Sequence, residues 1–258
     1  MNIGLIGNGA IARCVMGAIE GQGHRVSAIL LRPERVAVQT PPQISAVADI
    51  PAAIDLMIDC AGHSALAHYG PAILARGIDM ITVSLGALAD PVIAQNLEDA
   101  AAQGGSRLHL ASGAIGALDC LSAANIGTLH RVAYTGRKPP HGWKGSAAEA
   151  SIDLDAMTQG DAVHFEGTAR DAALRYTKNA NVAAAVALAG LGFDDTEVRL
   201  IADATITQNI HEISAEGAFG QFQFQISGNA LPDNPRSSAL AAMSVVSKLD
   251  QITRRVTF

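Results

Sequence analysis

The sequence opens with a glycine-rich turn that directly follows an apolar segment. Residues 2–6 (NIGLI) have the composition of a buried strand, and residues 7–12 (GNGAIA) match the pattern G-x-G-x-x-G/A. Residues 10–21 continue with apolar side chains at helical spacing. A strand, a glycine-rich turn and a helix in this order are typical of the first unit of a Rossmann fold, which binds a dinucleotide.

Each small residue of the turn has a physical role in such a fold. Gly7 permits the tight turn, Gly9 lets the backbone approach a pyrophosphate, and Ala12 lets the helix pack closely on the strand. We therefore expect the backbone at Gly7, Gly9, Ala10 and Ile11 to bind the pyrophosphate of NAD or NADP through N–H groups at the helix start. The alternative is a tight turn without a ligand.

The end of the second predicted strand, residues 25–31, leaves the choice between NAD and NADP open. In many such folds an acidic residue about 20 residues after the glycine turn holds the ribose 2′-OH. No acid stands there, Glu34 comes slightly late, and Arg32 could instead face a 2′-phosphate. Arg32 could equally be a solvated loop residue.

Strands and helices alternate through the first 111 residues. Further strands are expected at 55–60, 79–84 and 107–111, and further helices at 65–76 and 91–103. Such alternation predicts an α/β fold with a doubly wound parallel sheet.

The pattern changes after about residue 128. The segment 218–227 alternates apolar and polar side chains, which is typical of a strand with one buried face. We expect an α+β region with strands at 130–137, 162–168, 196–203, 209–216 and 218–227, and with helices at 169–176 and 182–190. A last helix over 237–254 is expected to return to the first domain. The predicted division is a Rossmann domain over 1–111 plus 235–258, and an α+β substrate, catalytic and oligomerisation domain over 112–234.

The composition argues against several classes of protein. The net charge is −6 and no Lys/Arg run is present, so nucleic-acid binding is not expected. No apolar run reaches the roughly 18 residues of a membrane span, and no leader precedes the first strand, so a cytoplasmic protein is expected. The cysteines Cys14, Cys60 and Cys120 are far apart and are predicted to be buried thiols. The histidine spacings do not indicate a metal site.

Five later segments carry a resemblance to a known family. They are SLGAL at 84–88, SGAIGALD at 112–119, RKPP at 137–140, KNANVA at 178–183 and NIH at 209–211. In this order and spacing the chain resembles the L-aspartate dehydrogenase family over nearly its whole length. The resemblance implies the reversible oxidation of L-aspartate by NAD(P)+ through iminoaspartate to oxaloacetate and ammonia, a reaction that can feed NAD biosynthesis. It also implies a homo-oligomer, at least a homodimer.

The resemblance assigns roles to three residues. The active-site histidine falls on His211, the cofactor-contacting asparagine on Asn181, and the cofactor-contacting alanine on Ala114. Strand periodicity puts Asn209 and His211 on one face, and an imidazole can pass protons near neutral pH. We hypothesise that His211 is the general acid and base of the carbinolamine or imine step. The alternatives are a structural histidine at 211 and a helix N-cap at Asn181.

A dicarboxylate substrate needs cationic partners. Arg137, Lys138 and Lys144 could bind its carboxylates, or they could be exposed loop charges. Ser112 could add a hydroxyl contact. His63 follows a predicted strand at its carboxyl end, so it could line the cofactor cleft.

Two other kinds of function stay open at this point. Homoserine dehydrogenases and dihydrodipicolinate reductases share the Rossmann start, but a Lys-centred catalytic motif that would favour them is not found. A non-catalytic NAD(P)-binding sensor would lack a proton donor for the reaction, and His211 supplies a candidate.

Overall fold

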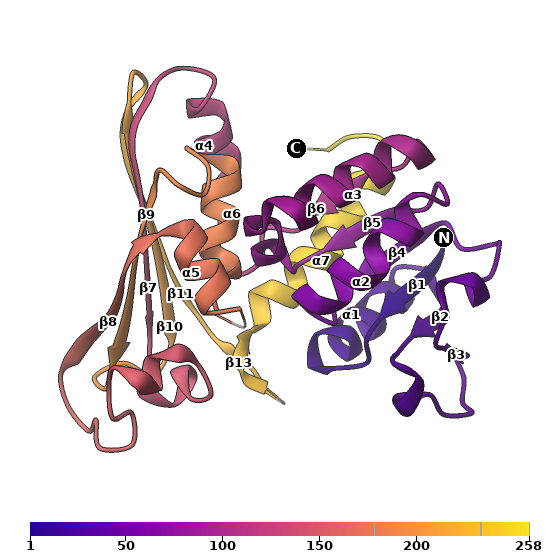
Figure 1. Cartoon of the computed structure of the whole chain (residues 1–258), viewed down its shortest axis with the longest axis horizontal. Coiled ribbons are helices and arrows are strands. Elements are labelled where there is room, and N and C mark those ends of the chain that lie inside the picture. Colours follow the sequence, from indigo (N-terminus) through magenta and orange to yellow (C-terminus); the bar gives the residue numbers. More distant parts are fainter. Residues whose placement is uncertain (178, 233, 258) are drawn as a thin grey trace. The chain divides into compact units, whose positions relative to one another are not determined.

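The computed structural model describes residues 1–177, 179–232 and 234–257, and it divides into two compact units (Figure 1). Unit 1 comprises Met1–Ala87, Pro91–Ala111 and Ala241–Phe258, and unit 2 comprises Leu88–Asp90 and Ser112–Leu240. Lys178, the first residue of the KNANVA segment, lies outside the described residues.

Unit 1 is built on a six-stranded parallel sheet with the strand order β3-β2-β1-β4-β5-β6. The order reverses between β1 and β4, as in a doubly wound fold, and the predicted Rossmann architecture is confirmed. The strands are β1 (Asn2–Ile6), β2 (Arg25–Leu30), β3 (Gln43–Ile44), β4 (Leu56–Asp59), β5 (Asp79–Thr82) and β6 (Leu108–Leu110).

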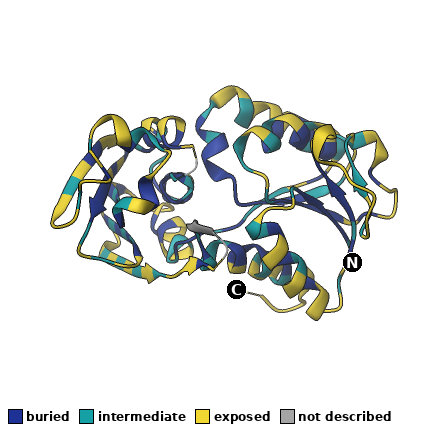
Figure 2. Cartoon of the chain, turned by 90° about the horizontal axis from the view of Figure 1, so that it is seen from below, coloured by how far each residue is buried: buried dark blue, intermediate teal, exposed yellow. Residues whose placement is uncertain are grey.

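Apolar runs become central strands here because helices cover the sheet. All four residues of β4 are buried, and the strands of this sheet are mostly dark blue in Figure 2. Helix α1 turns Ala12, Val15 and Ile19 inward at helical spacing. The helices are α1 (Ala10–Gly21), α2 (His63–Leu74), α3 (Pro91–Gly104) and α7 (Ala239–Thr253), the last of which joins unit 1 from Ala241 onward.

Unit 2 contains a five-stranded mixed sheet with the order β11-β10-β7-β9-β8. Only β7 and β9 run parallel, and the other pairs are antiparallel. The strands are β7 (Leu129–Lys138), β8 (Asp161–Thr168), β9 (Thr196–Asp203), β10 (Asn209–Gly217) and β11 (Gly220–Gly228), and a separate pair is formed by β12 (Ala230–Leu231) and β13 (Asn234–Ser238).

Helices cover one face of this mixed sheet. They are α4 (Leu118–Ala124), α5 (Ala169–Arg175) and α6 (Asn181–Ala189), and six of the nine residues of α6 are buried. Strand β7 turns Val132, Tyr134, Gly136 and Lys138 to the covered face, and all four are buried. The opposite face is polar and carries exposed side chains such as Gln223 and Gln225.

The expected burial of the cysteines was wrong for two of the three. Cys14 and Cys120 are exposed, because helices α1 and α4 bury the neighbouring Val15 and Leu121 instead. The short strands β3 and β13 were not predicted, since neither has an apolar run that would mark it. Short 3₁₀ helices also connect the elements, at Pro33–Arg35, Val47–Asp49, Leu85–Ala89, Pro140–Trp143 and Ala147–Ala150.

Candidate active site

The glycine turn of unit 1 has the shape that a dinucleotide pyrophosphate requires. Gly7 has φ +92°, and a Cβ there would lie 2.9 Å from the Cβ of Ala61, so a larger residue does not fit. A Cβ on Gly9 would meet nothing within 4 Å, so space is open beside the start of α1.

The start of α1 is free to bind an anion. Gly9 is its N-cap, no side chain of the described residues caps it, and its first turn has no acid. The N–H groups at Ala10 and Ile11 therefore point to the open space beside Gly9. These residues fit the pyrophosphate of NAD or NADP.

Arg32 lies where β2 ends and is the N-cap of the 3₁₀ helix that follows. Its side chain is 62% exposed, and its Nε lies 3.4 Å from Oε1 of Glu34. A cation that could bind a 2′-phosphate and an acid that could bind a ribose 2′-OH thus lie together after β2. The preference for NADP or NAD stays a prediction.

A buried carboxylate that the sequence reasoning missed stands at the end of β4. Oδ2 of Asp59 accepts hydrogen bonds from the hydroxyls of Thr82 and Ser84, at 2.8 and 2.6 Å. Oδ1 accepts the N–H of Ala61 at 2.9 Å. His63 begins α2 just beyond this loop, at the carboxyl edge of the sheet. The sequence feature that could have indicated Asp59 is its position as the polar residue that ends the otherwise apolar segment LMID.

In unit 2, His211 lies on the covered face of the sheet and is 3% exposed. Its Nδ1 lies 2.7 Å from the hydroxyl of Tyr134, and no partner is found for Nε2 among the described residues. Burial, and secondarily the charge of Lys138, lowers the pKa of His211 to about 3. The imidazole is therefore neutral at pH 7, with one ring nitrogen available to a ligand.

Gly136 makes this contact possible. It pairs with His211 across β7 and β10, and a Cβ there would lie 2.6 Å from the Tyr134 hydroxyl oxygen. Burial raises the pKa of Tyr134, so its hydroxyl keeps its proton and can donate it to Nδ1.

Lys138 lies on the same covered face and is 5% exposed. Its Nζ donates to Oδ1 of Asn179 at 2.9 Å and lies 4.9 Å from the ring centre of Trp143. Within the described part of the chain no carboxylate pairs with it, and burial lowers its pKa to about 8. A buried ammonium without a counter-ion is a site for an anionic ligand.

Asn209 is buried beside Lys138. A Cβ on Gly142 would lie 3.3 Å from Cβ of Lys138 and 3.8 Å from Oδ1 of Asn209, so Gly142 leaves room for both side chains. The amide of Asn209 forms no hydrogen bond with the residues that the structure describes. The structure thus brings together three of the predicted site residues, His211, Asn209 and Lys138.

An aromatic group that was not predicted surrounds this site. Nδ1 of His164 lies 3.1 Å from the Tyr176 hydroxyl, and its ring centre lies 4.4 Å from that of Trp143. A β-bulge lies at His164, so both His164 and Phe165 are buried. These contacts join β8 to segments far away in sequence, which no local pattern reveals.

Three further predicted site residues, Ala114, Ser112 and Asn181, belong to unit 2. Ala114 is buried, Ser112 is partly exposed, and a Cβ on nearby Gly116 would lie 2.9 Å from Phe224 on β11. Asn181 is the first residue of α6, and its N-cap is Ala180, so the alternative of an N-cap at Asn181 was wrong.

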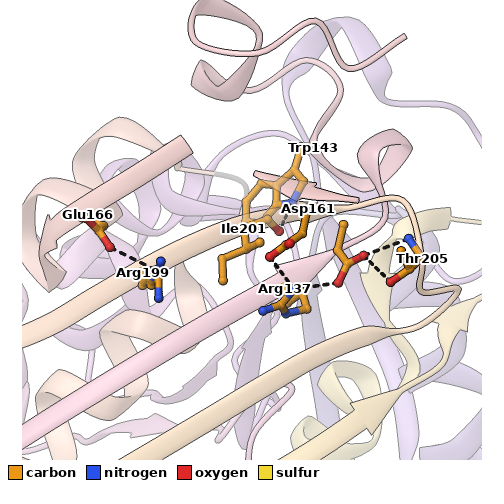
Figure 3. A network of polar contacts seen from close by, with 8 residues as sticks. Arg137, Trp143, Asp161, Glu166, Arg199, Ile201 and Thr205 are labelled. Carbon is orange, nitrogen blue, oxygen red and sulfur yellow. Dashed lines mark hydrogen bonds and ion pairs between the residues drawn. The ribbon is translucent and has the colours of Figure 1, made fainter. Parts of the chain in front are cut away.

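Two of the cations considered for the substrate lie elsewhere. Arg137 points to the opposite face from Lys138 and pairs with Asp161 at 3.0 Å and Asp203 at 2.7 Å (Figure 3). Lys144 is exposed and pairs with Asp155. Neighbouring residues of a strand alternate between faces, so only Lys138 joins the His211 side.

Through residues 1–177, 179–232 and 234–257, no helix has the length and apolarity that crossing a membrane requires. The same residues contain no group of three His, Cys, Asp or Glu side chains arranged to hold a metal ion.

A Rossmann unit with an open glycine turn, and a second unit with a buried His and Lys on one sheet face, define an NAD(P)-dependent dehydrogenase. Residues 7–111 match the family described as "Homoserine dehydrogenase, NAD binding domain", and residues 119–252 match "Aspartate dehydrogenase, C-terminal". The chain belongs to the L-aspartate dehydrogenase family. Both the predicted enzyme class and the predicted resemblance are confirmed.

Individual relatives agree with this placement. The chain is 54% identical over 255 residues to an L-aspartate dehydrogenase of Ruegeria pomeroyi, covering 97% of this chain and 92% of the relative. It is 43% identical to an L-aspartate dehydrogenase of Pseudomonas aeruginosa, covering 96% of both. The crystal structure of aspartate dehydrogenase from Thermotoga maritima superposes with a TM-score of 0.79 at 25% identity, covering 100% of this chain and 99% of that one.

Proposed function

We propose that the protein oxidises L-aspartate with NAD+ or NADP+, and that His211 is its general acid and base. The observation that carries the proposal is the buried group formed by His211, Tyr134 and Lys138 on one sheet face, where no described carboxylate pairs with Lys138. The names of the relatives supply the substrate.

The cofactor bound at the glycine turn would accept the hydride from Cα of L-aspartate. The residues around Lys138 supply what a dicarboxylate needs, since neither an acidic partner for its ammonium nor a hydrogen bond to the Asn209 amide is found among the described residues. We assign Lys138, Asn209 and Ser112 to substrate binding. Gly7, Gly9, Ala10, Ile11, Arg32, Ala114 and Asn181 are assigned to cofactor binding.

His211 would then move protons during hydrolysis of the iminium formed from L-aspartate. As water adds to the iminium carbon, Nε2 takes one of its protons and returns it to the nitrogen of the carbinolamine. As the C–N bond breaks, the carbinolamine hydroxyl gives its proton to Nε2, the carbonyl of oxaloacetate forms and ammonia leaves. Tyr134 holds the ring by its hydrogen bond to Nδ1. Burial is the main cause of the low pKa of His211, and the charge of Lys138 adds to it. A substrate carboxylate beside Lys138 would offset that second contribution and make His211 a stronger base.

The test is the reaction itself, followed by the absorbance of the reduced nicotinamide. His211→Ala should lower kcat for L-aspartate by at least about 100-fold and change the Kd of the reduced cofactor less than about twofold. His130→Ala, at an exposed position of the same sheet, is the matched control and should keep normal activity. If the wild type fails with L-aspartate and, in reverse, with oxaloacetate and ammonia, the substrate is wrong. If His211→Ala keeps its kcat, the catalytic role is wrong.

We further propose a homo-oligomer that works in the cytoplasm and can supply iminoaspartate to NAD biosynthesis. The polar face of the mixed sheet supports self-association, because the edge strand β11 leaves its polar side chains exposed there. The molecular mass in solution, by sedimentation or light scattering, tests the oligomeric state. A monomer at micromolar concentration would contradict it.

A further inference from the structure

The carboxylate of Asp59 accepts hydrogen bonds from donors at the ends of two neighbouring strands. It accepts from Thr82 and Ser84 near the end of β5, and from the N–H groups of Ala61 and Gly62 after β4. Asp59 is fully buried. No cation pairs with it in the part of the chain that the structure describes, so its charge is held by hydrogen bonds alone.

The hydrogen-bond pattern favours the ionised form. Burial is the largest influence and raises the pKa of Asp59 above its usual value, and the hydrogen bonds offset part of that rise. The Thr82 hydroxyl oxygen already accepts the Ser84 N–H at 2.9 Å, so its own hydrogen is free to point at Asp59. A carboxylate can accept every one of these donors, whereas a protonated carboxyl would present its own hydrogen to one of them.

The topology places Asp59 on the nicotinamide side of unit 1. A doubly wound sheet binds a dinucleotide across the point where the strand order reverses, which here lies between β1 and β4. The ends of β1 and β2 carry the glycine turn and Arg32, which serve the pyrophosphate and the adenosine ribose. The ends of β4 and β5 therefore lie on the side that binds the nicotinamide nucleotide. Ala61, held by Asp59, abuts the glycine turn at Gly7.

We propose that Asp59 makes the site favour the oxidised nicotinamide over the reduced one. The oxidised ring carries a positive charge that hydride transfer removes, while the other charges of the cofactor stay the same. A fixed buried carboxylate on this side attracts the oxidised ring and not the neutral reduced ring. The inference rests on the proposed binding of NAD or NADP by unit 1, and it assigns Asp59 a role in positioning charge rather than in proton transfer.

Asp59→Asn tests the proposal because it removes the charge and keeps the shape. The amide can still accept from the backbone N–H groups and donate to the hydroxyl oxygens. Calorimetric titration gives the Kd of the oxidised and reduced forms separately, using whichever of NAD or NADP the wild type binds more tightly. The ratio of the oxidised to the reduced Kd should rise severalfold, the scale expected when one of two attracting unit charges is removed at an effective dielectric constant of about 20.

Two matched variants separate charge from structure. Asp203→Asn removes a buried carboxylate of unit 2 and should leave the ratio unchanged. Thr82→Val keeps the carboxylate of Asp59 and removes two hydrogen bonds, the one that the Thr82 hydroxyl donates to Asp59 and the one that it accepts from the Ser84 N–H, so both Kd values should rise together. If Asp59→Asn does not fold, Asp59→Ser, which leaves room for a water molecule among the same donors, takes its place.

The outcomes distinguish the two proposals. Equal weakening of both cofactor forms in the Asp59 variant would overturn the inference and leave Asp59 a structural residue. A wild type that binds neither form would instead overturn the proposed function.

Discussion

Replacing Lys138 by methionine should make the protein more stable and less able to bind its substrate. Burial lowers the pKa of Lys138 from 10.5 to about 8. This difference corresponds to about 3 kcal/mol of folding free energy lost at neutral pH. Methionine fills similar space without a charge. It gives up the hydrogen bond to Asn179 and the contact with Trp143, each worth about 1 kcal/mol. We expect a net gain of about 1 kcal/mol or more at pH 7.

The stability advantage of Lys138→Met depends on pH. The folded pKa lies below the unfolded value, so the unfolded chain binds more protons between about pH 8 and pH 10.5. Wild-type stability should therefore rise through this window, and the advantage of Lys138→Met should shrink there. Urea unfolding of both proteins at pH 7, 9 and 10.5 measures the difference.

The same variant should raise the KM for L-aspartate by about 100-fold, because a substrate carboxylate loses its charged partner. The Kd of the reduced cofactor should change less than about twofold. Lys144→Met is the control, since Lys144 is exposed and pairs with Asp155 outside the His211 group. A Lys138→Met protein that is less stable at pH 7 and keeps its KM would refute the reasoning.

Two further predictions concern the cofactor. Gly9→Val should lower the melting temperature only by a few degrees, because a Cβ there meets nothing within 4 Å although valine is a poorer N-cap than glycine, and should weaken cofactor binding at least about tenfold because the side chain fills the space for the pyrophosphate; tight binding by this variant in a fluorescence titration would place the pyrophosphate elsewhere. Arg32→Ala should weaken the binding of NADP+ by about tenfold and the binding of NAD+ by less than about twofold, since only NADP+ has a 2′-phosphate. Equal Kd changes for the two cofactors would show that Arg32 is a solvated residue.

Local patterns predicted the elements better than the contacts between them. The run NIGLI and the turn GNGAIA were sufficient for β1, the glycine turn and α1, because a buried strand and a Rossmann turn both have local signatures. Strand β3 has only two residues and forms on the edge of the sheet, so nothing in its own sequence required it.

The candidate site was predicted in part for the same reason. Strand periodicity placed Asn209 and His211 on one face, but Tyr134 reaches His211 across 77 positions of sequence. Asp59 and His164 acquire their partners through the order of strands and through a β-bulge. Such pairings depend on topology, which the local sequence does not encode.

Strand β7 carries different chemistry on its two faces, and this restricts how related sequences can change. Lys138 faces His211, while Arg137 on the reverse side joins Asp161 and Asp203. Inserting or deleting a single residue between Tyr134 and Arg137 would exchange the two cations, because side chains alternate along a strand. We expect homologous chains to accept substitutions within residues 129–138 but to keep their number, and to vary in length only in the loops beyond.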